Sequence, residues 1–172
     1  NIMGVLNLTP DSFSDGGIFN SKNKGKKHAL SMFRSGANII DIGGESTRPG
    51  SKTIKKELEW SRVEKVIKTI SKKIPTSLDS RKSQLMKKGI KLGVKLINDV
   101  SGLDYDPETI NFLKKYKTPF IIQHTQGEPE NMQNRPIYKN ELLDIYDFFE
   151  EKIKFLRSVG IKHSNIIIDP GI

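Results

Sequence analysis

Six short apolar runs in this chain each end at or next to one polar residue that could bind a ligand. These polar residues are Asn7, Asp41, Asp79, Asn98, His124 and Asp169. A carboxylate accepts two hydrogen bonds side by side, and an amide side chain both donates and accepts, so these side chains could hold a polar ligand. For any one of them alone, the alternative is that a strand-end Asp or Asn caps a loop or helix.

Helix-like stretches separate most of these apolar runs. Near-continuous apolar strands that alternate with helices predict a parallel sheet covered on its faces. In a parallel barrel all strands end on the same rim, where barrel enzymes carry their active sites. The sequence therefore predicts an α/β fold, a TIM-type (β/α)8 barrel, with the six polar residues converging on one site.

The chain contains about six of the eight strands of such a barrel, which typically needs ~250 residues. It has 172 residues and stops directly after the strand-end sequence Asp169-Pro-Gly171. We expect one domain over residues 1–172 that is incomplete at its C-terminal end.

The helices that would position these strands are visible in the spacing of apolar residues. We expect helices over about 24–35, 55–73, 83–91 and 139–158, and another that begins at Pro107. Two strand-to-helix connections, over 8–23 and 43–54, are long and rich in Gly, Ser, Asp and Pro. Long connections of this kind in a compact fold are usually functional or disordered.

Composition restricts the classes of function. The net charge is +9, almost all from scattered lysines, which indicates a solvated surface; attraction of an anionic substrate such as a diphosphate is the alternative. No aromatic-interleaved basic stripe suggests nucleic-acid binding, and no apolar run approaches the ~20 residues of a membrane span. The chain has no cysteine, which excludes thiol nucleophiles and fits a cytoplasmic location.

Several motifs, taken together and in order, resemble the dihydropteroate synthase family of folate biosynthesis. They are Thr9-Pro-Asp-Ser-Phe-Ser-Asp-Gly-Gly17, Gly43-Gly-Glu-Ser-Thr-Arg-Pro-Gly50, Ser77-Leu-Asp-Ser80, Ile97-Asn-Asp-Val-Ser-Gly102, His124-Thr-Gln-Gly127 with Asn131-Met-Gln133, and Ile166-Ile-Ile-Asp-Pro-Gly171. The resemblance covers essentially the whole chain, and the first two motifs are the most specific.

The resemblance implies a (β/α)8 barrel that joins 6-hydroxymethyl-7,8-dihydropterin diphosphate to p-aminobenzoate, forming 7,8-dihydropteroate and diphosphate. It also implies Mg²⁺ as cofactor, sulfonamides as inhibitors and a homodimer. The reaction is a substitution at the exocyclic carbon of the pterin, in which diphosphate leaves and the arylamine attacks. Because an arylamine is already nucleophilic at neutral pH, no Ser–His–Asp or Cys–His arrangement is needed.

By this resemblance, Asp79, Asn98 and Asp169 bind the pterin, whose amide edge and exocyclic amine offer adjacent donors. Asn7 is the metal-linked residue, and its amide oxygen is a hard ligand suited to magnesium. Asp41 supports the metal or the loop ends, and His124 orients neighbouring loops.

The two long connections carry the remaining expected site residues. The resemblance gives catalytic roles to Phe13, Asp15 and Arg48. Thr47 contacts substrate, and Pro49 borders the aminobenzoate ring. Physically, Arg48 can form forked hydrogen bonds with diphosphate oxygens, and Asp15 can stabilise a pterin-methyl cation.

The sequence departs from the family pattern in three places. Arg81 stands where the family more often has Ser, and Thr125 follows His124 where Met is common. The lysine of strand seven and the Arg-x-His motif of strand eight are absent. We therefore expect the isolated 172 residues to be inactive. Two alternatives stay open: a non-catalytic pterin-binding module, and a methyltetrahydrofolate methyltransferase-type barrel.

Overall fold

The computed structural model describes residues 1–9, 17–46, 51–124 and 140–171, and for residues 17–22 it describes only the backbone. The elements in chain order are β1 (Met3–Asn7), α1 (Gly17–Arg34), β2 (Ile39–Gly43), α2 (Lys56–Ile70), β3 (Thr76–Asp79), α3 (Ser83–Lys91), β4 (Leu96–Asp99), α4 (Glu108–Tyr116), β5 (Phe120–Gln123), α5 (Glu141–Ser158), the 3-10 helix η2 (His163–Asn165) and β6 (Ile166–Asp169).

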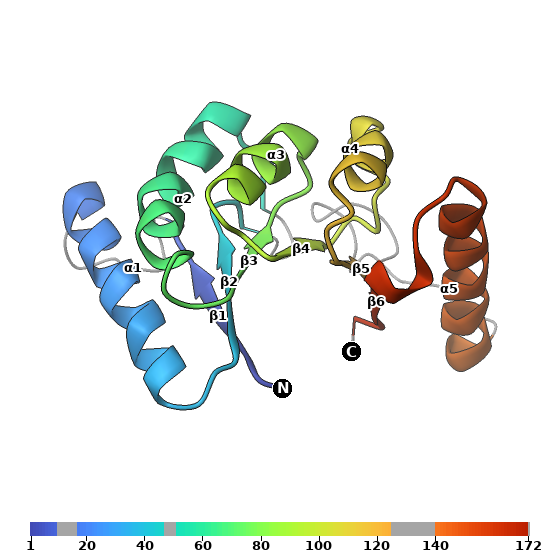
Figure 1. The fold of residues 1–172 in the computed structure, drawn as a ribbon, viewed down its shortest axis with the longest axis horizontal. Helices are drawn as coiled ribbons and strands as arrows, with labels where there is room; N and C mark the ends of the chain where they lie inside the picture. The colour runs from blue at the N-terminus through green and yellow to red at the C-terminus, as the bar shows by residue number, and fades with distance from the viewer. Residues whose placement is uncertain (10–16, 47–50, 125–139, 172) are drawn as a thin grey trace.

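The described strands form one parallel sheet in the order β1-β2-β3-β4-β5-β6, so each strand pairs with the next one in the chain. Figure 1 shows these strands as a curved arc with the helices on its convex side. Sequential parallel pairing with helices outside is the arrangement of a TIM barrel. The predicted α/β class and the six strands are confirmed.

The two faces of the sheet have different environments. Alternate side chains that face the helices are almost fully buried: Leu6, Ile40, Ile42, Leu78, Ile97, Phe120 and Ile122. On the concave face the outermost strands carry exposed side chains, with Val5 57% and Ile167 44% exposed, whereas Asp41 and Ser77 in the middle strands are buried. The hydrophobic core therefore lies between sheet and helices, and the concave face is free to carry polar groups.

Helix positions agree with the spacing of apolar residues except at one end. The expected helix over 83–91 matches α3, and Pro107 directly precedes α4. The expected start of the first helix at about residue 24 was wrong, because α1 begins at Gly17. Asn and Ser in this stretch suggested a loop, but helix propensity is a weak signal that tertiary context overrides.

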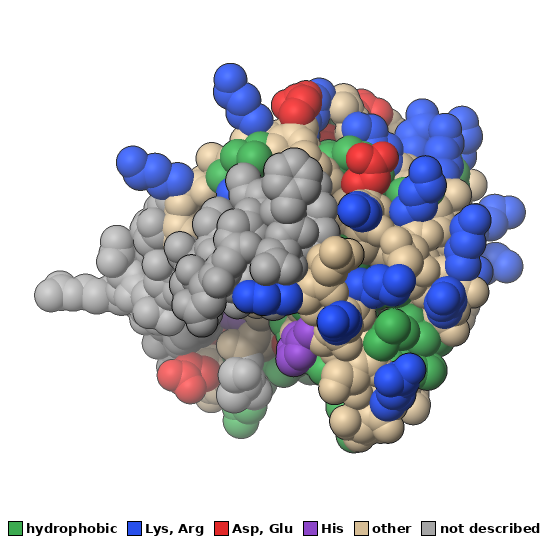
Figure 2. All heavy atoms as spheres, turned by 90° about the vertical axis from the view of Figure 1, so that its left-hand side faces the viewer, with side chains coloured by type: hydrophobic (Ala, Val, Ile, Leu, Met, Phe, Trp, Pro, Cys, Tyr) green, Lys and Arg blue, Asp and Glu red, His purple; other side chains and the backbone are tan. Residues whose placement is uncertain are grey.

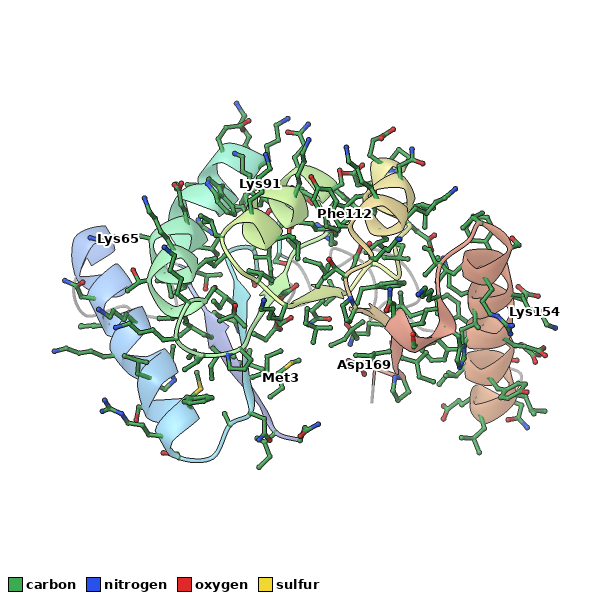
Figure 3. All side chains as sticks on the ribbon, in the orientation of Figure 1. Met3, Lys65, Lys91, Phe112, Lys154 and Asp169 are labelled. Carbon is green, nitrogen blue, oxygen red and sulfur yellow. The ribbon has the colours of Figure 1, made fainter. Side chains whose placement is uncertain are left out.

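The outer surface is rich in basic side chains. Figure 2 shows lysine and arginine side chains spread over the described part of one face, with acidic and hydrophobic groups between them. In Figure 3, Lys65, Lys91 and Lys154 lie on the outside of the arc, whereas Met3 and Asp169 lie on its concave side. Among the residues described, no helix is long and apolar enough to cross a bilayer.

Candidate functional site

The carboxyl ends of the first four strands bring polar residues into one row. Asn7 pairs in register with Gly43, Gly43 with Asp79, and Asp79 with Asn98. Partners in register on parallel strands point their side chains to the same side of the sheet. Three of the predicted site residues, Asn7, Asp79 and Asn98, therefore share the concave face at one rim.

Gly43 brings two of these side chains close together. A Cβ atom at position 43 would lie 3.1 Å from the Oδ1 atom of Asn7 and 3.1 Å from the Oδ2 atom of Asp79. Both distances are shorter than an ordinary carbon–oxygen contact, so the missing side chain provides space between the amide and the carboxylate. The sequence analysis had treated Gly43 only as part of a loop motif.

The family resemblance implies a pterin as the ligand of this row. For that ligand we expect Gly43→Ala to weaken binding about 10-fold, because the methyl group would displace Asn7 or Asp79 by a few tenths of an ångström from their positions beside a rigid ring. Isothermal titration with 6-hydroxymethylpterin measures the change. Gly36→Ala is the matched control for a glycine outside the site, since no atom lies within 4 Å of a Cβ there, although its φ of +108° makes that variant less stable. Equal loss of affinity in both variants would contradict the expectation.

Asp41 lies two residues before Gly43 on the concave face and is 3% exposed. Its Oδ2 atom accepts a hydrogen bond of 2.9 Å from the Nδ2 atom of Asn98. This contact orients the Asn98 amide. The Oδ1 atoms of both residues are buried and accept no hydrogen bond from the described part of the chain. Buried acceptors without partners carry a free-energy cost that a ligand donor can relieve.

Two carboxylates of the site hold protons more tightly than usual. Burial raises the pKa of Asp41. Burial and the neighbouring Asp41 charge raise the pKa of Asp79 well above its ordinary value. Carboxylates in such surroundings gain from a ligand that supplies hydrogen-bond donors, because the donors stabilise the charged form.

Asp169 stands at the end of β6, in register with Gln123 on β5. It lies on the same concave side of the arc (Figure 3). Its Oδ1 atom accepts a hydrogen bond of 2.9 Å from the Gly171 N–H. The structure thus places Asp169 on the same rim, two strands beyond Asn98, where it also stabilises the turn that follows β6.

His124 packs against α5. Its ring contacts the rings of Phe148 and Phe149 edge-on, at centroid distances of 5.0 and 6.4 Å. Burial lowers the pKa of His124, which favours the neutral imidazole. This packing agrees with a role in holding the end of β5 against its neighbours rather than in binding a metal.

Five predicted site residues lie outside the described residues: Phe13, Asp15, Thr47, Arg48 and Pro49. Their roles remain predictions. The ends of the segment that contains the last three are described, and the structure shows what holds them.

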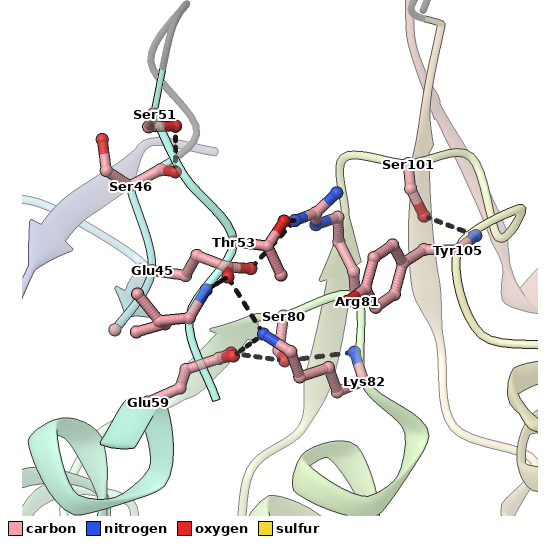
Figure 4. Close-up of polar contacts among 12 residues, drawn as sticks. Glu45, Ser46, Ser51, Thr53, Glu59, Ser80, Arg81, Lys82, Ser101 and Tyr105 are labelled. Atoms are coloured by element: carbon pink, nitrogen blue, oxygen red, sulfur yellow. Dashed lines mark hydrogen bonds and ion pairs between the residues drawn. The ribbon is translucent and has the colours of Figure 1, made fainter. Parts of the chain in front are cut away.

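A buried group of four charged residues, absent from the sequence analysis as a site, surrounds these ends. Glu45, Glu59, Arg81 and Lys82 are 5%, 1%, 2% and 8% exposed and contact one another (Figure 4). One signal could have identified it: Glu59 occupies a position four residues before Val63, within the apolar stripe of α2. A charged residue in such a stripe indicates a buried ion pair.

The metal expectation can be tested against Asn7. Asn7 is exposed at the rim. Magnesium keeps several waters and is bound through one or two protein oxygens together with substrate phosphates, so an accessible amide oxygen fits it. No group of three or more His, Cys, Asp or Glu in the described ranges forms a preformed cage for a metal.

The sequence matches the pterin binding enzyme family over residues 3–172. Among curated proteins, dihydropteroate synthase from Synechocystis is 38% identical over 99% of this chain and 60% of its own length. The enzyme from Clostridium beijerinckii is 43% identical over 99% of this chain and 62% of its own. This chain thus spans about 60% of the length of these relatives.

Solved structures agree with the sequence matches. A dihydropteroate synthase from Yersinia pestis, determined with a sulfonamide drug, superposes with a TM-score of 0.91 at 38% identity and covers 99% of this chain and 62% of its own. The enzyme from Burkholderia cenocepacia, complexed with 7,8-dihydropteroate, gives a TM-score of 0.85 at 31% identity, with 99% of this chain and 57% of its own covered.

Proposed function

This chain belongs to the pterin-binding enzyme family, and we propose that the protein that carries it is a dihydropteroate synthase. That protein would transfer the pterin-methyl group of 6-hydroxymethyl-7,8-dihydropterin diphosphate to p-aminobenzoate. Because the chain spans about 60% of the length of its relatives, the activity is proposed for the whole protein.

One observation carries the proposal: the row of Asn7, Asp79 and Asn98 on the concave rim. A carboxylate with a raised pKa, Asp79, stands next to the Asn98 amide, whose buried oxygen accepts no hydrogen bond from the described residues. A pterin edge offers an N–H, an exocyclic amine and a carbonyl, which can satisfy both groups at once. We propose that Asp169, at the end of β6, binds the same pterin ring from the opposite end of the row of strands.

The chemistry needs little more than binding and charge neutralisation. The bond between the exocyclic carbon and the diphosphate oxygen breaks, and diphosphate takes the electron pair. The arylamine nitrogen donates its lone pair to that carbon and then loses a proton to water. In this proposal Arg48 holds the departing diphosphate and Asp15 faces the cationic carbon, while Phe13, Thr47 and Pro49 border the aminobenzoate.

Asn7 is the residue we assign to magnesium, together with oxygens of the substrate diphosphate. When bound, the ion would offset negative charge on the leaving group. Asp41 would keep the Asn98 amide in position beside it, as its 2.9 Å hydrogen bond does in the structure.

The proposal also covers inhibitors, cellular location and oligomeric state. Sulfonamides, as analogues of p-aminobenzoate, would compete at the aminobenzoate site, and a relative from Yersinia pestis was solved with such a drug. A cytoplasmic homodimer completes the proposal. Cell fractionation and analytical ultracentrifugation test these two parts.

The deciding experiment is an assay of the protein expressed from its complete gene. We expect release of diphosphate only when both the pterin diphosphate and p-aminobenzoate are present, with formation of 7,8-dihydropteroate. Pterin binding without turnover would favour a binding module, and turnover that requires a corrinoid partner would identify a methyltransferase. The isolated residues 1–172 are expected to show no turnover in the same assay.

A further inference from the structure

We propose that Arg81 and Lys82 are positioning residues for this reaction. They hold the two ends of the connection between β2 and α2, and so fix the segment that carries Thr47 and Arg48 relative to Asp79. The inference rests on the proposed function for its catalytic consequence, while the anchoring itself rests on the contacts alone.

Both ends of the connection meet at the carboxylate of Glu45. On one side, the Oε1 atom of Glu45 accepts a 2.7 Å hydrogen bond from the Ile54 N–H, which joins residue 45 to residue 54. Nearby, the Ser51 hydroxyl donates to the Ser46 carbonyl at 2.6 Å. The described residues on both sides of 47–50 thus form one hydrogen-bonded group, Glu45, Ser46, Ser51 and Ile54, which we call the base of the connection (Figure 4).

Arg81 and Lys82, in the connection between β3 and α3, hold this base. The Nη2 atom of Arg81 lies 3.1 Å from the Oε2 atom of Glu45 and 3.2 Å from the Oγ1 atom of Thr53. The Nζ atom of Lys82 lies 3.0 Å from the Oε1 atom of Glu45. One guanidinium and one ammonium thus contact both ends of the connection.

The cations are themselves fixed from other elements. Lys82 also pairs with Glu59 of α2, whose other oxygen accepts a 2.6 Å hydrogen bond from the Ser80 hydroxyl. Arg81 stacks on the ring of Tyr105, with 4.2 Å between its Cζ atom and the ring centroid. The base is therefore tied to α2 and to the connection that follows β4.

The charges of the group balance. Burial alone would raise the pKa of Glu45, but the Ile54 N–H, Lys82 and Arg81 outweigh it and hold the pKa below its usual value. For Glu59, burial outweighs its partners and raises the pKa. Removing one cation would leave a buried carboxylate without compensation, which is strongly destabilising.

This arrangement has a consequence for catalysis because Arg81 and Lys82 directly follow Asp79 and Ser80 in the chain. The same short stretch carries the pterin carboxylate at one end and the cations that hold the 47–50 segment at the other. A shift of the base would leave the pterin site in place and displace Thr47 and Arg48. Displacements of about 1 Å can cost up to ~100-fold in rate.

The test compares Lys82→Met with the charge-balanced pair Lys82→Met/Glu59→Gln in the whole protein. The pair keeps Glu45 opposite Arg81 and removes the unpaired buried carboxylate, so it separates positioning from folding. We expect it to lower kcat/KM for p-aminobenzoate about 10-fold or more, while its Kd for 6-hydroxymethylpterin changes less than ~2-fold. Lys154→Met is the matched control, because Lys154 forms an exposed 2.9 Å ion pair with Glu150 on α5.

Hydrogen exchange at the Ile54 amide reports the anchoring without catalysis. We expect it to speed up about 10-fold in the charge-balanced pair and to stay unchanged in Lys154→Met. Unchanged exchange and unchanged kinetics in an active enzyme would overturn the inference, as would equal losses of pterin affinity and turnover. If the wild-type protein makes no dihydropteroate, the proposed function fails and the catalytic role fails with it, whereas the exchange result still decides the anchoring.

Discussion

Asp79→Asn is expected to weaken pterin binding by about 100-fold. The carboxylate can accept two parallel hydrogen bonds from adjacent donors of the ring, and each charge-assisted bond contributes roughly 1.5–3 kcal/mol. The asparagine side chain keeps one acceptor oxygen, but its NH2 group replaces the second oxygen and would face a hydrogen-bond donor of the ligand. A loss of about 3 kcal/mol corresponds to a little over 100-fold in Kd.

The pH dependence of binding gives an independent signature of the same group. The pKa of Asp79 is raised by burial and by the charge of Asp41, and bound donors favour the charged form and lower it again. Wild-type affinity should therefore be constant above the raised pKa and fall as the pH drops through it. A protonated Asp79 resembles asparagine in charge, so the two affinities should converge at low pH.

Isothermal titration with 6-hydroxymethylpterin across pH 5–8 checks both statements. Asp104→Asn is the control, since Asp104 is an exposed acid that pairs with Lys152 of α5 and is not part of the row of Asn7, Asp79 and Asn98. An Asp79→Asn variant that binds as tightly as wild type at neutral pH would rule out Asp79 as the pterin carboxylate.

The fold could be predicted because the order of strands and helices is visible in the local spacing of apolar residues. Short, near-continuous apolar runs such as Ile39–Ile40 and Ile166–Ile168 indicate strands, and their alternation with helical stripes leaves few topologies. The start of α1 at Gly17 was missed, because the Asn- and Ser-containing sequence before Lys24 resembles a loop.

The site was predicted in part. Asn7, Asp79 and Asn98 could be placed on one rim because each lies at or next to the end of a strand, and the ends of parallel strands share a rim. The space at Gly43 and the buried group of Glu45, Glu59, Arg81 and Lys82 could not, because both depend on contacts between segments distant in sequence. Arg81 appeared in the sequence only as a departure from a family pattern, whereas in the structure it supports the connection after β2.

Asp99 is the second residue whose substitution should have a large effect, in this case on stability. It ends β4 on the face opposite to the site and is fully buried. Its Oδ1 atom accepts hydrogen bonds from the backbone N–H and the hydroxyl of Ser101, at 2.9 and 2.6 Å. Its Oδ2 atom is buried and has no hydrogen-bond partner among the described residues.

Burial raises the pKa of Asp99 from 3.8 to about 6, against the opposing effects of Ser101 and the Arg81 cation. The folded protein therefore binds this proton more tightly than the unfolded chain does. The stability that the group contributes is fully present below pH 3.8 and is lost as the pH rises through about 6. At 1.36 kcal/mol per pKa unit, the loss at neutral pH is of the order of 3 kcal/mol.

Asp99→Asn should recover most of this free energy. The amide oxygen can accept the same two hydrogen bonds from Ser101, and the neutral NH2 group replaces the charged oxygen that has no partner. We expect the variant to be more stable than wild type by up to about 3 kcal/mol at pH 7.5, and nearly equal to it at pH 4. Urea denaturation at pH 4, 5, 6 and 7.5 measures the free energy of unfolding of both proteins. Asp147→Asn, on the exposed side of α5, is the control. If the free energies of unfolding of wild type and variant differ by the same amount at every pH, Asp99 has the same pKa in the folded and the unfolded chain. The buried carboxylate would then be stabilised in its charged form, contrary to the expectation.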